Sequence, residues 1–155
     1  MKRYLLLITT LLLTTSCIDN KEPTHLGVGV RKLGKVSGFA LAPCQKSNCV
    51  NSQPELTDEK RLIDPIKIIS TKDLAFEKIM GIVLKDQSLN IISSTDTYIK
   101  AKQVQFGKII TDVEFFFAKS GQIHMRAEMR GVPHDLGNGR RLVESIRFKF
   151  HQNDY

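Results

Sequence analysis

Apolar side chains occupy every second position in two stretches of the chain, residues 112–117 and residues 123–130. The apolar set of the first stretch is Val113, Phe115 and Phe117, and that of the second is Ile123, Met125, Ala127 and Met129. A period of two over this length predicts half-buried antiparallel strands. Between them, Lys119-Ser120-Gly121 predicts a three-residue hairpin turn with glycine in the left-handed position.

The length of this turn fixes the expected register of the hairpin. It places Phe117 opposite Ile123, Phe115 opposite Met125, and Glu114 opposite Arg126. A two-residue turn would instead place Phe115 opposite Arg126, which would mix apolar and charged side chains on one face. The sequence therefore predicts a hairpin with one apolar face and one charged face.

Two further segments carry apolar residues at helical spacing. The first runs to about Lys85 and can be capped by Ser70 or Thr71; the second runs from about Arg140 to His151 and can be capped by Asn138 or Asp135. Their apolar faces are, in order, Leu74, Phe76, Ile79, Met80 and Val83, and then Leu142, Val143, Ile146 and Phe150. We expect both helices to cover the apolar face of the sheet.

Three further strands are predicted at Ile66–Ile69, Ser88–Ser93 and Tyr98–Phe106, whereas the proline-containing residues 42–65 are expected to form a long loop. The resulting order is strand, helix, four strands, helix. This order predicts an α+β domain, with an antiparallel sheet of four to five strands and two helices packed on one face.

The N-terminus has the pattern of a secretory signal peptide: Lys2 and Arg3, a short apolar run over residues 4–13, and small residues before Cys17. The run is shorter than the roughly 20 apolar residues of a spanning helix. The small residues resemble a bacterial lipoprotein signal, in which the cysteine is lipidated, although Thr14 stands where leucine is usual. A conventional signal without lipid attachment and an N-terminal core helix are the alternatives.

Three segments follow from this interpretation: a lipoprotein signal peptide at 1–16, a polar tether at 17–40 and a single α+β domain at 41–155. Ile18, rather than aspartate, follows the cysteine, and by resemblance to such signals this favours the outer membrane, facing the periplasm. We therefore expect a lipid-anchored protein of the bacterial cell envelope.

The net charge of +7 bears on which binding partners are expected. A basic balance often accompanies nucleic-acid binding, but an envelope location argues against that partner. The membrane, through the lipid anchor, and an anionic small molecule or envelope component are the expected partners. The lysines and arginines are also scattered enough to serve solubility alone, and no cofactor is expected.

Cys44 and Cys49 lie five residues apart in a polar stretch. A redox pair usually has two intervening residues rather than four, and a zinc site would need two more ligands that the spacing does not offer. With Cys17 lipidated in an oxidising compartment, a small disulfide loop is favoured. Free thiols and redox or metal chemistry remain the alternatives.

The charged face of the hairpin is the leading candidate site. Its ligand-binding candidates are Asp112, Glu114, Arg126, Arg130, Asp135 and Arg140. Arginine binds carboxylate or phosphate in a bidentate way, so the face could form a polar pocket for an anionic ligand. The alternative is a lattice of ion pairs on an exposed sheet face, each contributing under about 1 kcal/mol.

A catalytic alternative exists on the same face. A hydrolase could use Glu114, His124 or Asp135 for acid–base chemistry, but no residue is identified as the nucleophile. The four histidines show no metal-ligand spacing, so no metal site is expected. The sequence therefore favours a binding or structural module over an enzyme.

Three motifs in order, "CQKSNCVNS", "TDVEFFF" and "RAEMRGVPHDLGNGRRLVESIR", resemble the uncharacterised domain family numbered 1499, found in bacterial envelope lipoproteins and some plastid proteins. The resemblance covers about residues 40–150. The matching positions are Asn48, Cys49, Val50, Ser52, Asp112, Val113, Glu114, Phe115, Arg126, Arg130, Asp135, Gly137, Arg140, Val143, Glu144, Ile146 and Arg147. Ala127 and Met129 replace serines of the family pattern, Thr111 replaces an aspartate, and Gly139 stands where asparagine is usual. The resemblance implies a fold and a location, and no activity.

Overall fold

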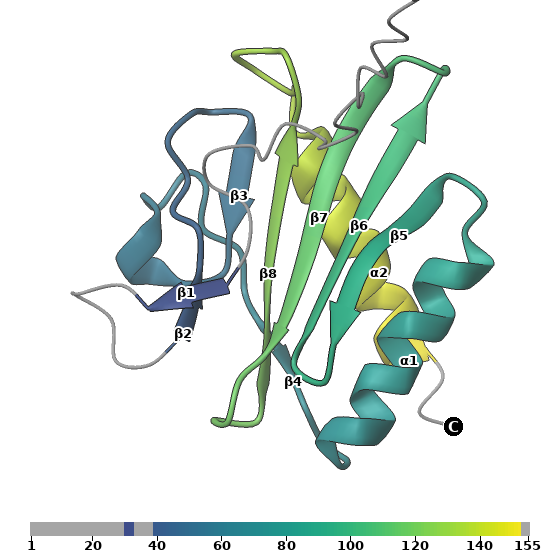
Figure 1. The fold of residues 1–155 in the computed structure, drawn as a ribbon. Coiled ribbons are helices and arrows are strands. Elements are labelled where there is room, and N and C mark those ends of the chain that lie inside the picture. Colours follow the sequence, from purple (N-terminus) through teal and green to yellow (C-terminus); the bar gives the residue numbers. More distant parts are fainter. Residues whose placement is uncertain (1–29, 33–38, 153–155) are drawn as a thin grey trace, which may run out of the picture.

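The computed structural model describes residues 30–32 and 39–152, which fold around one antiparallel sheet (Figure 1). In chain order the elements are β1 (Val30–Lys32), β2 (Phe39–Leu41), β3 (Cys49–Asn51), the 3-10 helix η1 (Pro54–Leu56), β4 (Ile66–Lys67), α1 (Lys72–Lys85), β5 (Leu89–Thr95), β6 (Tyr98–Gln105), β7 (Ile109–Phe117), β8 (Gln122–Met129) and α2 (Asn138–Gln152).

The sheet runs in the order β3-β8-β7-β6-β5, and β4 pairs with the other end of β8. Every pairing in it is antiparallel. Both helices cover the same face, while β1 and β2 form a separate pair on the opposite side (Figure 1). The predicted α+β class, with an antiparallel sheet and two helices on one face, is confirmed.

The β7–β8 hairpin has the predicted register. Phe117 pairs with Ile123, Phe115 with Met125, and Glu114 with Arg126. Gly121 closes the turn with a φ of 75°, in the left-handed region that glycine adopts without a steric penalty. The alternation of apolar and polar residues thus determines which side of the sheet each residue faces.

The core lies between the sheet and the two helices. Phe115, Ile123 and Met125 are fully buried, and the rings of Phe76 on α1 and Phe117 on β7 lie 5.1 Å apart. The helix residues buried here are Ala75, Ile79, Ile82 and Val83 from α1, and Leu142, Val143, Ile146 and Phe150 from α2. The predicted apolar face of α2 is confirmed. On α1 the prediction is wrong for Leu74, which is 57% exposed, because the buried side of the helix is centred on Ile79 and Val83 and takes in Ala75 and Ile82.

Each helix is capped by a side chain that was predicted to cap it from the sequence. Thr71 Oγ1 accepts a hydrogen bond from the backbone N–H of Leu74 at 3.3 Å. Asp135 accepts two, from Gly137 N at 3.0 Å and Gly139 N at 2.7 Å. These contacts satisfy backbone donors that the first helical turn leaves unpaired.

The prediction of one long loop over residues 42–65 is wrong in its middle. β3 lies there and pairs with β8, so this segment extends the sheet. Its three residues are too few to show an alternation in the sequence. Further upstream, β1 pairs with β2 within the segment expected to be a polar arm. The signal peptide, Cys17 and most of the tether lie outside the described residues. No helix within the described ranges is long and apolar enough to span a membrane.

Candidate functional site

The face of the sheet opposite the helices is organised in rows, because the register places side chains of neighbouring strands directly opposite one another. The first row is Tyr98, Phe116 and His124; the second is Lys100, Glu114, Arg126 and Asn51; the third is Lys102, Asp112, Glu128 and Cys49. The first row is aromatic and the other two are mainly charged. The predicted charged face and the cysteine pair therefore share one surface.

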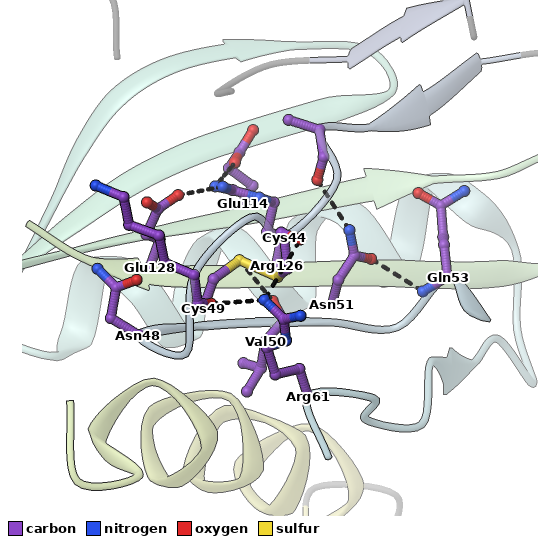
Figure 2. Close-up of a disulfide and its surroundings, with 12 residues drawn as sticks. Cys44, Asn48, Cys49, Val50, Asn51, Gln53, Arg61, Glu114, Arg126 and Glu128 are labelled. Atoms are coloured by element: carbon purple, nitrogen blue, oxygen red, sulfur yellow. Dashed lines mark hydrogen bonds and ion pairs between the residues drawn. A yellow bond between two sulfur atoms is a disulfide. The ribbon is translucent and has the colours of Figure 1, made fainter. Parts of the chain in front are cut away.

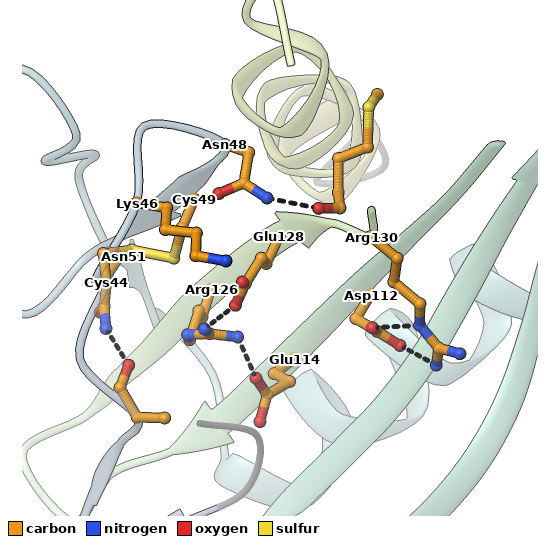
Figure 3. A network of polar contacts seen from close by, with 12 residues as sticks. Cys44, Lys46, Asn48, Cys49, Asn51, Asp112, Glu114, Arg126, Glu128 and Arg130 are labelled. Carbon is orange, nitrogen blue, oxygen red and sulfur yellow. Dashed lines mark hydrogen bonds and ion pairs between the residues drawn. A yellow bond between two sulfur atoms is a disulfide. The ribbon is translucent and has the colours of Figure 1, made fainter. Parts of the chain in front are cut away.

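The second row forms a buried network around Arg126 (Figure 3). Its Nη1 donates to Glu114 Oε2 at 3.0 Å, and its Nη2 donates to Glu128. Tyr98 donates its hydroxyl hydrogen to Glu114 Oε1 at 2.6 Å. Only 1% of Arg126 and 0% of Glu114 are exposed. The alternative of an exposed ion-pair lattice is therefore wrong for these residues, because they are enclosed.

The chain preceding β3 accounts for this enclosure. β2 packs against β7 and β8, and Ala40, Leu41 and Ala42 have no exposed surface. Asn51 Nδ2 donates to Ala42 O at 3.0 Å, and Leu41 N donates to Gln53 Oε1 at 2.8 Å. This crossing segment lies over the polar face and excludes water from it.

The third row carries a second ion pair at the end of the sheet. Arg130 binds Asp112 in a bidentate way, with both nitrogen-to-oxygen distances at 2.7 Å (Figure 3). A small cavity of about 370 Å³ lies beside this pair and is also lined by Lys46, Asn48 and Glu128. The two arginines of the face are thus matched by the protein's own carboxylates.

The predicted disulfide between Cys44 and Cys49 is confirmed, with its Cα atoms 5.5 Å apart. It lies beside Glu128 and Arg126 and closes a loop at the edge of the sheet (Figure 2). From this loop, Ser47 donates to Pro133 O at 2.7 Å. The disulfide loop is therefore joined to the segment that connects β8 and α2.

Two of the six candidate residues lie away from the face. Asp135 caps α2, and its Oδ2 lies near the apolar face of the sheet, against Ala127 and Gly139. Arg140 donates from Nη2 to Lys60 O and Leu62 O at 2.9 and 3.0 Å. The structure brings Asp112, Glu114, Arg126 and Arg130 together, whereas Asp135 and Arg140 stabilise the helix start and the loop before β4.

A cavity of about 1270 Å³ lies over the aromatic row. Tyr98, Phe116 and His124 line it, and the Phe116 and His124 rings are stacked with centroids 6.4 Å apart. The remaining lining residues are Ser52, Gln53, Pro54, Glu55, Pro65, Ser93, Thr95, Thr97, Phe117, Ala118, Lys119, Ser120 and Gln122. The lining combines aromatic rings and prolines with hydroxyl and amide groups.

A short hydrogen-bond chain orients His124. Ser52 Oγ accepts from the backbone N–H of Met125 at 2.8 Å and lies 3.2 Å from His124 Nδ1. A hydroxyl has one donor hydrogen and two acceptor lone pairs, so this contact fits either tautomer of the neutral ring. Burial lowers the pKa of His124, and the nearby Glu55 carboxylate and a backbone hydrogen bond with Ser52 offset part of this effect. The neutral ring therefore carries one donor and one acceptor nitrogen in the cavity wall.

Tyr98 is also held in its neutral form. Burial, followed by the charge and hydrogen bond of Glu114, raises the pKa of Tyr98 well above its ordinary value. Its hydroxyl thus links the aromatic row to the buried network. The pKa shifts of Tyr98 and His124 both favour the neutral form, and both residues line the large cavity.

Sequence reasoning placed the site on the charged rows and did not identify the aromatic row as a site. One signal was available: Phe116 is apolar at a position where the alternation calls for a polar residue. Ser52 matched the family pattern, but neither it nor Gln53 could be placed at the cavity, because their contacts with β8 and β2 form only on folding. Within residues 30–32 and 39–152, no group of three or more His, Cys, Asp or Glu residues could hold a metal ion.

Comparison with known proteins identifies one matching family. The model of the family DUF1499, "Protein of unknown function", matches residues 40–150. This range includes β3, the disulfide, both rows of charged residues and the capped start of α2. A search of curated proteins finds no match.

Proposed function

The chain belongs to the DUF1499 family of proteins of unknown function, and we propose that it is a ligand-binding module of the bacterial cell envelope, lipid-anchored through Cys17. The observation that carries the binding function is the large cavity over the aromatic row. The anchor rests on the N-terminal pattern of Lys2, Arg3, a short apolar run and small residues before Cys17.

The cavity has the features expected of a small-molecule site. Such sites are concave, mainly apolar, and carry a few oriented polar groups. Here the floor consists of Tyr98, Phe116 and His124, with hydroxyl side chains such as Thr95 and Thr97 at its border. Groups held neutral by burial are typical of functional sites as well.

This lining favours a neutral ligand with a flat or extended apolar body and at least one oxygen that accepts a hydrogen bond. In the tautomer that carries its hydrogen on Nε2, His124 would donate to that oxygen. The charged rows are not a favourable site for an anionic ligand. Arg126 and Arg130 already bind Glu114, Glu128 and Asp112 there, so an anion would have to displace these carboxylates.

Binding can be tested with the neutral fluorescent probe N-phenyl-1-naphthylamine. We expect its fluorescence to increase in the presence of the protein and to fall when a long-chain alcohol displaces it. His124→Phe should weaken displacement by the alcohol, because it keeps a ring but has no hydrogen-bond donor. His151→Phe, at an exposed position near the end of α2, is the matched control. No enhancement with the wild-type protein would refute the proposal.

The anchor requires a separate experiment. Mass spectrometry of the membrane fraction should show a diacylglyceryl addition that is lost in Cys17→Ser. An unmodified, soluble product would refute lipid anchoring and would leave the binding proposal standing.

One observation favours a hydrolase as the second candidate: Ser52 Oγ lies within hydrogen-bonding distance of His124 Nδ1. Against this, Ser52 is only 2% exposed and its oxygen accepts from Met125 N–H. We therefore assign Ser52 to positioning the ring. Hydrolysis of p-nitrophenyl acetate that disappears in Ser52→Ala, while the fold is retained, would favour the enzyme instead.

A further inference from the structure

Two large apolar side chains protrude from turns in an unfavourable backbone conformation. Phe106 is 90% exposed with a φ of 50°, and Leu136 is 89% exposed with a φ of 51°. Positive φ is disfavoured for residues that carry a Cβ and is usually left to glycine or asparagine. Neither residue gains burial in return, so the fold of the domain does not explain them.

The turn at Phe106 shows the conflict most clearly. Lys108 N donates to Gln105 O at 3.2 Å, and the two residues between them, Phe106 and Gly107, both have positive φ. Turns of this kind prefer Asn-Gly or Gly-Gly at the central positions. Phe106 is unfavourable for the turn and makes no buried contact in return, which indicates a role other than stabilising the fold.

Both turns lie at the same end of the sheet. Arg130, at the start of the β8–α2 loop, donates its backbone N–H to Ile110 O at 2.8 Å, and Asn138 donates to Thr111 Oγ1 at 3.1 Å. These bonds join the β8–α2 loop, which carries Leu136, to the first residues of β7, next to the Phe106 turn. Figure 1 shows the two turns projecting from the same end.

The exposed charges beside the two apolar residues are positive. Arg130 is neutralised by its ion pair with Asp112, and Arg140 binds backbone carbonyl groups of the loop before β4. Asp135 is buried as the cap of α2. Lys108 and Arg141 are exposed beside the two apolar residues. Exposed apolar side chains flanked by cations are suited to the interface of an anionic bilayer, which offers apolar depth and negative headgroups together.

We propose that Phe106 and Leu136, flanked by Lys108 and Arg141, form a membrane-contact surface that inserts into an anionic bilayer. This inference builds on the proposed envelope location and adds which end of the domain faces the lipid. It would hold the domain in one orientation on the membrane, with its sheet face accessible from the side. The lipid on Cys17 would supply attachment, and this surface would supply orientation.

The absence of tryptophan from the chain allows a site-specific test. Phe106→Trp and Leu136→Trp each introduce a single fluorescent reporter at an exposed position, so the fold should be retained. Phe148→Trp, at a position 63% exposed on α2, is the matched control. Each full-length variant is mixed with vesicles of phosphatidylglycerol and phosphatidylethanolamine, with and without brominated lipid.

We expect both turn reporters to shift their emission to shorter wavelength and to be quenched by brominated lipid, while the Phe148→Trp reporter stays unchanged. The Phe106→Ser/Leu136→Ser variant should bind vesicles more weakly, by about tenfold for each side chain removed. Lys108→Glu should weaken binding to anionic vesicles more than Lys67→Glu, which makes the same charge change at an exposed position on β4.

The outcomes separate this inference from the proposed function. If the protein sediments with vesicles but neither turn reporter responds, the inference is overturned and the anchor stands. If all three reporters respond equally, insertion is not specific to this end and the inference also fails. Binding of the apolar probe in the cavity is measured without vesicles, so neither result bears on it.

Discussion

The buried network around Arg126 allows a quantitative prediction. Replacing Glu114 by leucine removes one of two carboxylates that bind the guanidinium and the acceptor of the Tyr98 hydroxyl. Arg126 is only 1% exposed, so water cannot replace the lost partner. Removing one member of a buried ion pair typically costs about 3–5 kcal/mol. Glu114→Leu should therefore reduce the free energy of unfolding by about that amount.

The double variant Glu114→Leu/Arg126→Met tests whether the stability contributions of the two residues are coupled. Arg126→Met alone should also cost about 3–5 kcal/mol, because it removes a buried guanidinium that binds the fully buried Glu114 carboxylate. With both groups apolar, the remaining penalties are the unpaired Tyr98 hydroxyl, about 1–3 kcal/mol, and Glu128, whose side chain is 26% exposed and stays hydrated. The two losses should thus be strongly non-additive, with a coupling energy of at least about 3 kcal/mol.

Urea unfolding followed by circular dichroism measures these differences through the transition midpoint and slope. Glu144→Ala is the control, because its ion pair with Arg147 has a similar length, 2.6 Å, but a 44% exposed carboxylate. It should cost less than about 1 kcal/mol. If Glu114→Leu costs no more than this control, or if the double variant equals the sum of the singles, the network is not enclosed as described.

Three further predictions concern single features of the fold. Replacing Cys44 and Cys49 by serine should lower the free energy of unfolding by about 2 kcal/mol, as expected for so short a closed loop. The same loss should appear when the wild-type protein is unfolded in a reductant. An unchanged unfolding midpoint would show that the disulfide does not stabilise the fold. Burial lowers the pKa of His124, so as the pH is lowered this histidine takes up a proton in the unfolded chain before it does so in the folded protein. The contribution of His124 to the free energy of unfolding should therefore be complete above about pH 6.5 and decline as the pH falls toward the lowered pKa. If a His124→Gln variant keeps the same dependence of stability on pH in urea titrations, this prediction is refuted. Asp135→Ala removes the acceptor of two backbone N–H groups at the start of α2 and should cost about 1–2 kcal/mol in thermal or urea unfolding, whereas a loss within error would mean that another group or water caps the helix.

Much of the architecture could be predicted from local patterns. The alternation in β7 and β8 and the glycine of their turn specify the register, because a shift by one residue would move every apolar side chain to the charged face. The helical spacing of Leu142, Val143 and Ile146 likewise specifies which side of α2 packs on the sheet. These features depend on neighbours a few residues apart, which is the range that a sequence pattern records.

The candidate site was predicted only in part. Asp112, Glu114, Arg126 and Arg130 were correctly grouped, since register alone brings them together. Their burial was not predicted, because it depends on the crossing segment before β3. The position of Arg140 was also missed, since its partners are carbonyl groups in an irregular loop, which every residue possesses.

The sequence by itself thus determined the fold class and the hairpin register, which follow from spacing along the chain. Three motifs indicated the family, and the expected oxidising compartment favoured pairing of the two cysteines. The tertiary structure decided how the polar face is used. It enclosed Glu114 and Arg126 beneath the chain that precedes β3 and left the aromatic row beside an open cavity. It also joined Ser52 to His124, 72 residues later. Such contacts form when distant segments pack together, and the enclosure of a charge depends on what covers it rather than on its own position in the chain.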